Sequence, residues 1–278
     1  MPIFELNNVG YMYAGQITAL RDITLTIGSG EQIAILGANG CGKSTLLKLL
    51  AGLILPSTGE IRAFEQVLTE KVLNGADGGS FAQSFRRKVG LVFQNADVQL
   101  FCPTVFDEIA FGPLQLALPQ DEVRQRVQEV MEMLEIEHLK NRPPYALSGG
   151  EKKRVAIASV LPVNPDVLLL DEPTTGLDPR TQAWFEDLLH TLGKAGKTII
   201  LATQDLDIVD AISERVLVFG EDHTIAASRN VADILGDREL LLHVNLIHEH
   251  YHKHGELWHK HDETRQQHSH EFNDHNKH

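Results

Sequence analysis

The chain has 278 residues, of which 42% are hydrophobic and 23% charged, as is ordinary for a soluble globular protein. Its net charge of −13, with no basic block, disfavours nucleic acid as a main partner. No apolar run approaches the ~18 residues of a membrane-spanning helix, and the N-terminal residues MPIFELNNVG do not resemble a signal peptide. Two cysteines form no disulfide framework, which favours a reducing cytosol. One of them, Cys41, is interpreted as small filler in preference to a redox sensor.

The first two predicted strands are apolar or alternating segments at 3–9 and 23–27. Tyr13 falls between them, in a predicted loop. Its ring could stack on an adenine face or simply cover the edge of the core. The position alone does not choose between these two roles.

A glycine-rich turn follows the apolar run 33–36 and precedes a helical pattern that begins at Lys43. Gly37, Gly42, Lys43 and Ser44 fit the phosphate-binding pattern G-x-x-x-x-G-K-[ST]. Glycines let backbone N–H groups curl toward phosphate oxygens, and the helix adds its positive N-terminal end. We predict a nucleotide site in which Lys43 contacts the β- and γ-phosphates and Ser44 ligates Mg²⁺.

The next segment is predicted to lead into a buried strand. A loop and a strand are expected at 53–66, a surface turn at 74–80, and an apolar strand at 88–93 that ends at Gln94. A glutamine at a strand end is weak evidence by itself, because a surface polar cap is the ordinary reason for it.

Residues 95–165 are predicted to form a helical subdomain inserted into an α/β core. Apolar residues recur with a helical period in 120–136, on a face made by Val123, Val127, Val130, Met131 and Leu134. Pro143 and Pro144 close this section.

Ser148, three residues before Glu151, predicts a capping box ahead of an apolar-periodic helix. Gly149 and Gly150 lie beside exposed N–H groups, so the turn could also bind an anion, as the first glycine-rich loop does. One interpretation is a well-capped helix and nothing more. The other is a second anion site that faces the first across a dimer.

A continuous apolar strand at 167–170 ends in Asp171 and Glu172. Acidic residues at the C-terminal end of a buried parallel strand are typical of a ligand-binding site at the carboxyl edge of the sheet. Asp171 is predicted to hold Mg²⁺, directly or through water, and Glu172 to act as the general base toward the attacking water. Strands at 198–202 and 215–219, separated by a helix, predict a parallel α/β sheet covered on both faces.

The composition changes after about residue 240, and residues 243–278 carry 11 of the 14 histidines. Apolar residues are sparse there, which predicts a flexible tail without a core of its own. Neutral imidazole is a common ligand for nickel, cobalt and zinc, so we expect the tail to bind such an ion, with a solvated polar tail as the alternative. The predicted ligands are His248, His250, His252 and His254.

The segments GANGCGKST, LSGGEKKRVAIA and LLLDEPTTGLDP, together with Gln94 and the turn at 203–205, have the order and spacing of ABC-transporter ATPase subunits. This resemblance covers about residues 3–235. FQNADVQLF and VFDEIAFGPLQLAL further resemble the ATPases of energy-coupling-factor importers, especially the cobalt and nickel branch. The resemblance implies an ABC ATPase domain over 1–240, with an antiparallel β subdomain and a helical subdomain at about 95–165, followed by the tail at 241–278.

The resemblance also implies a head-to-tail dimer, homomeric or heteromeric, with two ATP molecules at its interface. Tyr13 would stack on adenine, Gln94 would contact Mg²⁺ and water, and Asp178 would couple the two sites. The implied nucleotide-binding residues are Tyr13, Gly37, Asn39, Gly40, Gly42, Lys43, Ser44, Thr45, Ser148, Gly149, Gly150, Glu151 and Asp178. The catalytic residues would be Glu172, Gln94 and Gln204, and the Mg²⁺ ligands Ser44, Gln94 and Asp171.

One position departs from the family, because a histidine usually follows the threonine of the later strand, and this chain has Gln204 there. An amide can donate a hydrogen bond to phosphate, as a neutral imidazole can, but it takes up no proton near neutral pH. This departure puts the rate of hydrolysis in question.

The sequence thus predicts an ATP-hydrolysing subunit on the cytoplasmic face of the cell membrane, bound to integral membrane subunits that import cobalt or nickel. A vitamin importer is the alternative cargo class. A soluble ABC ATPase that acts on ribosomes or DNA is another alternative, although such proteins usually have two cassettes or a long coiled coil. A metal-storage protein is a third, on the basis of the tail alone.

Overall fold

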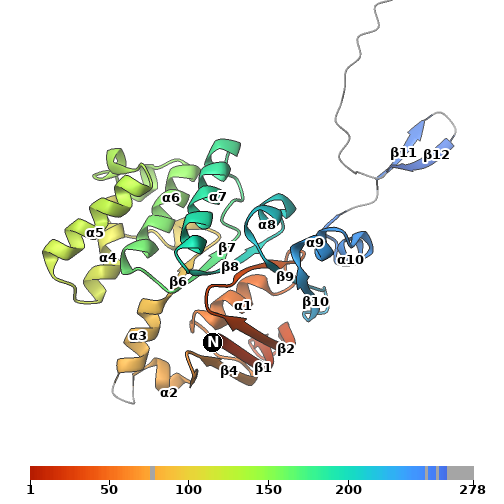
Figure 1. Cartoon of the computed structure of the whole chain (residues 1–278), viewed down its shortest axis with the longest axis horizontal. Helices are drawn as coiled ribbons and strands as arrows, with labels where there is room; N and C mark the ends of the chain where they lie inside the picture. Colours follow the sequence, from red (N-terminus) through yellow and green to blue (C-terminus); the bar gives the residue numbers. More distant parts are fainter. Residues whose placement is uncertain (76–78, 248–249, 255–256, 262–278) are drawn as a thin grey trace, which may run out of the picture.

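The computed structural model describes residues 1–75, 79–247, 250–254 and 257–261 (Figure 1). The strands are β1 (Pro2–Tyr13), β2 (Ile17–Gly28), β3 (Gln32–Leu36), β4 (Thr58–Ala63), β5 (Gln66–Val67), β6 (Val89–Val92), β7 (Val167–Asp171), β8 (Thr198–Thr203), β9 (Arg215–Phe219), β10 (Ile225–Asn230), β11 (His250–His254) and β12 (Leu257–His261). The α-helices are α1 (Lys43–Leu50), α2 (Glu70–Leu73), α3 (Ser80–Lys88), α4 (Val105–Gln115), α5 (Gln120–Met133), α6 (Gly149–Val160), α7 (Pro179–Lys194), α8 (Leu206–Ile212), α9 (Val231–Leu235) and α10 (Arg238–His243).

A six-stranded sheet in the order β10-β9-β3-β8-β7-β6 forms the centre of the molecule. Strands β9, β3, β8, β7 and β6 run parallel, and β10 pairs antiparallel with β9 at the edge. The carboxyl ends of β3, β6, β7 and β8 therefore meet at one edge of the sheet, where loops far apart in the sequence come together. The predicted α/β fold with a parallel core sheet and an antiparallel β subdomain is confirmed.

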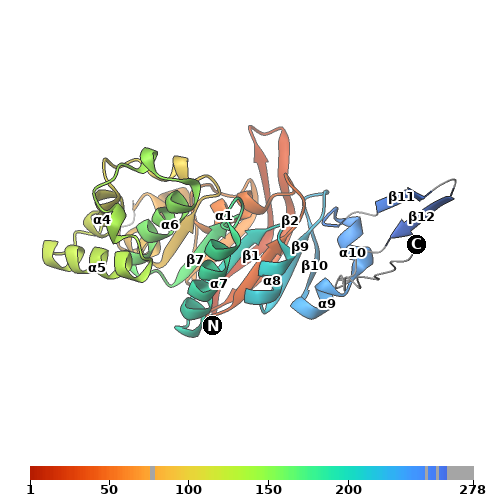
Figure 2. The same cartoon turned by 90° about the horizontal axis from the view of Figure 1, so that it is seen from above.

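The antiparallel subdomain is a second sheet in the order β2-β1-β4-β5. Strands β1 and β2 have 12 residues each and pair over their whole length, although the register shifts at several points. They form a long ribbon that projects from the body of the protein (Figure 2). Tyr13 is consequently the last residue of β1 and does not lie in the predicted loop, because the pairing continues to Tyr13 and Ile17.

Two hydrophobic cores lie on opposite faces of the parallel sheet, as the alternation within each strand requires. Ile33 and Ile35 of β3 pack with the antiparallel sheet and α1, whereas Ala34 and Leu36 pack with the helices on the other face. In β8, Ile200 and Ala202 belong to the first core, and Ile199 and Leu201 to the second. The sheet is thus fixed from both sides, which positions the loops at its edge.

Helix α4 packs against both α5 and α6, and the three helices form a lobe beside the sheet (Figure 1). Helix α6 begins with the predicted capping box, in which Ser148 and Glu151 each satisfy the other's backbone N–H. Helix α5 ends at Met133, before the predicted end at 136, and the chain turns at Glu135 with φ 55°.

Packing against the core continues past residue 240. Leu241 and Val244 are buried in the core on the helical face, and Leu246 and Ile247 pack against it. We therefore place the start of the tail after residue 247. Among the described residues, no helix is both long enough and apolar enough to cross a membrane.

Candidate functional site

A pocket of about 380 Å³ opens where the carboxyl ends of the parallel strands meet the antiparallel sheet. The phosphate-binding loop follows β3, Gln94 follows β6, and Glu172 follows β7, so the topology brings three separate predictions into one cavity. The lining residues are Tyr13, Ile17, Thr18, Ala19, Asn39, Gly40, Gly42, Lys43, Ser44, Thr45, Gln94, Glu172 and His223.

The loop between β3 and α1 needs glycine at its last position. Gly42 has a φ of +117°, and a Cβ atom there would lie 2.3 Å from the carbonyl oxygen of Ala19 in β2. Only glycine avoids both the backbone strain and this contact. Cys41, just before it, is 3% exposed, and burial raises the pKa of its thiol, which disfavours the reactive thiolate.

Lys43 is buried, with 6% of its surface exposed, and its ammonium group turns back toward the loop. Its Nζ donates to the carbonyl oxygens of Gly37 at 2.7 Å and Ala38 at 3.3 Å. It also forms an ion pair with Glu172, with Nζ 3.5 Å from Oε1. A buried ammonium needs such partners, because an unpaired charge in this environment would be costly.

Ser44 joins the loop to the end of β7, since its Oγ donates to Asp171 Oδ1 at 2.9 Å. Burial raises the pKa of Asp171, while the hydrogen bond from Ser44 and the positive charge of Lys43 act against that rise. A hydroxyl and a carboxylate oxygen at this distance form the beginning of a site for a hard divalent cation.

Glu172 leaves β7 in a left-handed conformation, with φ 44°, and is 7% exposed. Its backbone N–H donates to the carbonyl oxygen of Ala202 in the neighbouring strand, and its Oε2 accepts from Thr175 Oγ1 at 3.3 Å. Among the described residues, the buried Oε1 has no hydrogen-bond partner, and its contact is the ion pair with Lys43. Glu172 therefore lines the pocket with a carboxylate whose Oε1 is paired with the Lys43 ammonium group.

Lys153 of α6 is a residue whose role the sequence analysis missed. Its Nζ donates to the carbonyl oxygen of Gln94 at 2.7 Å and to that of Glu172 at 3.0 Å, so it ties the two loops together. Burial lowers the pKa of this ammonium group, against the raising effect of Asp171 and Glu172. Its position on the buried face of a helix was the only signal in the sequence.

The opposite end of the pocket is aromatic. The Tyr13 hydroxyl lies 3.2 Å from Thr45 Oγ1, and its ring meets Tyr11 edge-on at 4.8 Å between centroids. His223 also lines this pocket, with Nδ1 3.3 Å from the carbonyl oxygen of Cys41. The sequence analysis missed His223, because its position depends on β9 lying beside β3.

Gln204 follows β8 and reaches the same loop, where its Nε2 donates to Oδ1 of Asn39. The amide thus has a partner on the phosphate-binding loop. Gln204 and Asn39, which the sequence analysis proposed separately, are brought into direct contact.

The remaining predicted nucleotide-binding residues lie outside the pocket. Ser148, Gly149, Gly150 and Glu151 form the start of α6, and hydrogen bonds from Ser148 lower the pKa of Glu151. Asp178 caps α7 and accepts from the backbone N–H groups of Arg180 and Thr181. Hydrogen bonds from Thr181 lower the pKa of Asp178. Within one chain, these residues do not contribute to the cavity.

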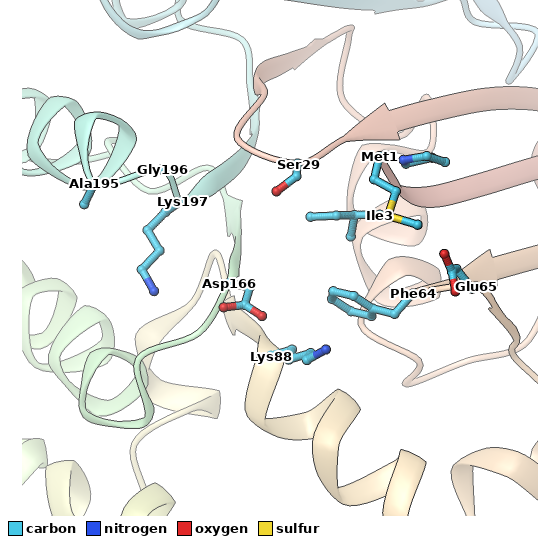
Figure 3. A pocket seen from close by; sticks show the side chains of 11 residues that line it. Met1, Ile3, Ser29, Phe64, Glu65, Lys88, Asp166, Ala195, Gly196 and Lys197 are labelled. Atoms are coloured by element: carbon cyan, nitrogen blue, oxygen red, sulfur yellow. The ribbon is translucent and has the colours of Figure 1, made fainter.

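A larger cavity, of about 560 Å³, lies at the opposite edge of the sheet, near the amino ends of β3, β6, β7 and β8. The side chain of Asp166 lies between those of Lys88 and Lys197 (Figure 3). The Lys88 ammonium also lies 4.5 Å from the centroid of the Phe64 ring. None of the predicted site residues lines this cavity, so it is separate from the phosphate-binding loop.

The predicted metal ligands of the tail fall at the limit of the described structure. His248 lies outside the described residues, whereas His250, His252 and His254 belong to β11. Among the residues that the structure describes, no group of three or more histidine, cysteine or acidic residues could hold a metal ion.

The sequence is similar to that of known transport ATPases. The ABC transporter family model matches residues 20–175. An ABC transporter ATP-binding protein of Methanosarcina acetivorans is 57% identical over 91% of this chain and 92% of its own length. The nickel import ATP-binding protein NikO of Rhodobacter capsulatus is 48% identical, over 88% of this chain and 96% of its own length.

Solved structures of the family are also similar. The cbiO1 protein of Clostridium perfringens, part of the transporter complex cbiONQ, is 39% identical with a TM-score of 0.72, over 88% of this chain and 95% of that protein. A bacterial ABC transporter cassette solved as a dimer is 31% identical with a TM-score of 0.72, over 82% of this chain and 98% of that one. The resemblance found in the sequence is confirmed, and this chain belongs to the ABC transporter family as an ATP-hydrolysing subunit.

Proposed function

We propose that this chain powers an importer of the energy-coupling-factor kind whose cargo is nickel or cobalt. The observation that carries the proposal is the single pocket that unites the phosphate-binding loop with Gln94 and Glu172. The nickel-import relative, similar over most of both chains, supports the choice of cargo. The chain would act at the cytoplasmic face of the cell membrane, bound to separate integral membrane subunits.

In the proposed mechanism, the phosphates of ATP compete for Lys43. Its ammonium group would exchange the carbonyl oxygens of Gly37 and Ala38, and the Glu172 carboxylate, for β- and γ-phosphate oxygens. This exchange would free Glu172 to accept a proton from the attacking water. The same event that binds the nucleotide would thus prepare the general base.

Ser44, Asp171 and Gln94 would hold Mg²⁺, because hydroxyl, carboxylate and amide oxygens are the ligands that this hard cation prefers. Ser44 and Asp171 are already in contact, and Gln94 lines the same pocket. When bound, the cation would neutralise charge on the phosphate oxygens. Lys153 would hold the backbone of Gln94 and Glu172 at a fixed separation.

A second ATPase subunit would complete the site. Ser148 to Glu151 and Asp178 contribute nothing to the pocket of their own chain, and the start of α6 presents backbone N–H groups suited to an anion. In a head-to-tail dimer, these groups would face the γ-phosphate bound by the partner, and Asp178 would lie at the contact between the two sites. Tyr13 would stack on adenine at the aromatic end.

The tail would bind nickel or cobalt through its histidines, as an accessory to transport. Imidazole is a suitable ligand for both ions. The nucleotide pocket lies entirely within residues 13–223, so this metal binding would be separate from ATP binding.

The Lys43→Ala variant should bind ATP about 10- to 100-fold more weakly and lose hydrolysis, because hydrogen bonds to a charged phosphate are lost. Isothermal titration with ATP and a phosphate-release assay would measure both effects. Lys194→Ala, at an exposed lysine in the last turn of α7, is the matched control and should behave as wild type. Unchanged affinity and turnover in Lys43→Ala would refute the phosphate-binding role.

The Glu172→Gln variant should retain ATP binding while hydrolysis falls about 10²- to 10⁴-fold, because only the proton-accepting carboxylate is lost. Affinity should be at least that of wild type, since Lys43 no longer has a charged competitor for the phosphates. Gel filtration with ATP should show an accumulated dimer. Wild-type turnover would remove Glu172 from the role of general base.

The Gln204→His variant tests the departure from the family. Histidine should raise the hydrolysis rate several-fold with little change in ATP affinity, because an imidazole can both donate to phosphate and take up a proton. Steady-state kinetics with ATP would measure the change in kcat and KM. A lower kcat would mean that the contact between Gln204 and Asn39 is the better arrangement for this site.

The cargo is tested with the complex purified from native membranes through this chain. Integral membrane subunits should co-purify, and vesicles that contain the complex should accumulate nickel only when ATP is supplied. Vesicles with the Glu172→Gln complex are the control and should not accumulate it. Uptake of a vitamin without nickel would overturn the proposed cargo, and co-purification with ribosomes alone would overturn the role in transport.

A further inference from the structure

His223 lines the nucleotide pocket, but neither the proposed phosphate contacts nor the proposed metal site uses it. It lies in the turn between β9 and β10, just after the carboxyl end of β9. Because β9 pairs with β3, and the phosphate-binding loop follows β3, this turn comes next to that loop. The topology thus adds to the pocket a residue that is far from the loop in the sequence.

Hydrogen bonds hold the backbone of His223 in an unusual conformation. Its φ is 66°, in the left-handed region that residues other than glycine seldom adopt. Its N–H donates to the carbonyl oxygen of Gly220 at 3.1 Å, and its carbonyl oxygen accepts from the N–H of Arg21 in β2 at 2.9 Å. The turn is thereby attached to β2, whose residues Thr18 and Ala19 line the same pocket. Backbone strain of this kind, held in place beside a ligand site, points to a functional side chain.

The contact with the phosphate-binding loop decides which ring nitrogen can bind a ligand. Nδ1 lies 3.3 Å from the carbonyl oxygen of Cys41, and because a carbonyl oxygen can only accept, Nδ1 carries a hydrogen. In the neutral imidazole, Nε2 is then an acceptor. Among the residues that the structure describes, none donates to Nε2. The ring therefore adds an unused acceptor to the wall of the pocket.

An acceptor in this position distinguishes between the groups of ATP. Phosphate oxygens are themselves acceptors, so Nε2 of the neutral ring cannot bond to them. The donors of ATP are the two ribose hydroxyls and the amino group of adenine. The ribose comes between the phosphates, expected at Lys43, and the adenine, expected at Tyr13. The hydroxyls are the nearer donors, because His223 contacts the loop itself, at Cys41.

We propose that His223 is a further nucleotide-binding residue, whose Nε2 accepts a hydrogen bond from a ribose hydroxyl. The site would then prefer ribonucleoside triphosphates, because a deoxy analogue leaves Nε2 without a partner in the pocket. This proposal rests on the nucleotide site proposed above and gives His223 no part in the chemical step.

The test compares the affinities of ATP, 2′-deoxy-ATP and 3′-deoxy-ATP for the full-length protein. Isothermal titration is made at about pH 8, where free imidazole is neutral, and without Mg²⁺, so that hydrolysis does not interfere. The wild type should bind at least one deoxy analogue about two- to tenfold more weakly than ATP, which is the effect of one neutral hydrogen bond. His223→Gly should bind all three nucleotides alike, and glycine suits the left-handed backbone of the turn. The matched control His190→Gln, at an exposed histidine of α7, should keep the wild-type preference.

A second variant, His223→Phe, keeps a ring in the wall of the pocket but removes both nitrogens, and it should lose the preference as well. A phenylalanine variant that still prefers ATP would overturn the hydrogen bond, as would equal affinity of the wild type for all three nucleotides. Purine riboside triphosphate, which lacks the amino group, tests the other donor. If His223→Gly loses discrimination against this analogue instead, the assignment to the ribose is wrong. Failure of the wild type to bind ATP at all would refute the nucleotide site itself, so the two failures are distinguishable.

Discussion

The organisation of the site depends on one buried positive charge, the ammonium group of Lys43. It is held by two carbonyl oxygens of its own loop and by the carboxylate of Glu172. The Lys43 side chain is only 6% exposed, so its charge needs such partners. Without them, the charge would be uncompensated in the protein interior, which solvates ions poorly. Because the partners include the proposed general base, phosphate binding by Lys43 would change the arrangement of charges around Glu172.

The second constraint is a set of hydrogen bonds that joins helix α6 to the loops around this charge. Lys153 projects from α6 and donates to two backbone carbonyl oxygens, those of Gln94 and Glu172. Carbonyl oxygens belong to the backbone, so a movement of α6 would shift the loops themselves as well as their side chains. The segment that precedes α6 carries exposed apolar side chains, among them Phe101 and Phe111, whose rings meet edge-on at 4.9 Å between centroids.

The phosphate-binding end of the pocket was predictable from sequence because its determinants are local. Gly42, Lys43 and Ser44 are consecutive in the sequence. The acids at the end of β7 directly follow a continuous apolar run, which can be recognised without knowing the fold. Lys153 and His223 escaped prediction because their roles depend on which strands are neighbours. No short segment of the sequence shows the strand order β9-β3-β8-β7-β6. Tyr13 was placed in a loop because the irregular register of β1 and β2 breaks the alternation on which strand prediction depends.

The tail shows the same limit in a simpler setting. Its composition predicts metal binding, yet composition cannot say which nitrogens would share an ion. In the sequence, His252 is nearer to His250 and His254 than to His259, whereas the pairing of β11 with β12 places His259 opposite His252. Which histidines are neighbours therefore depends on the pairing between the strands, which composition alone does not give.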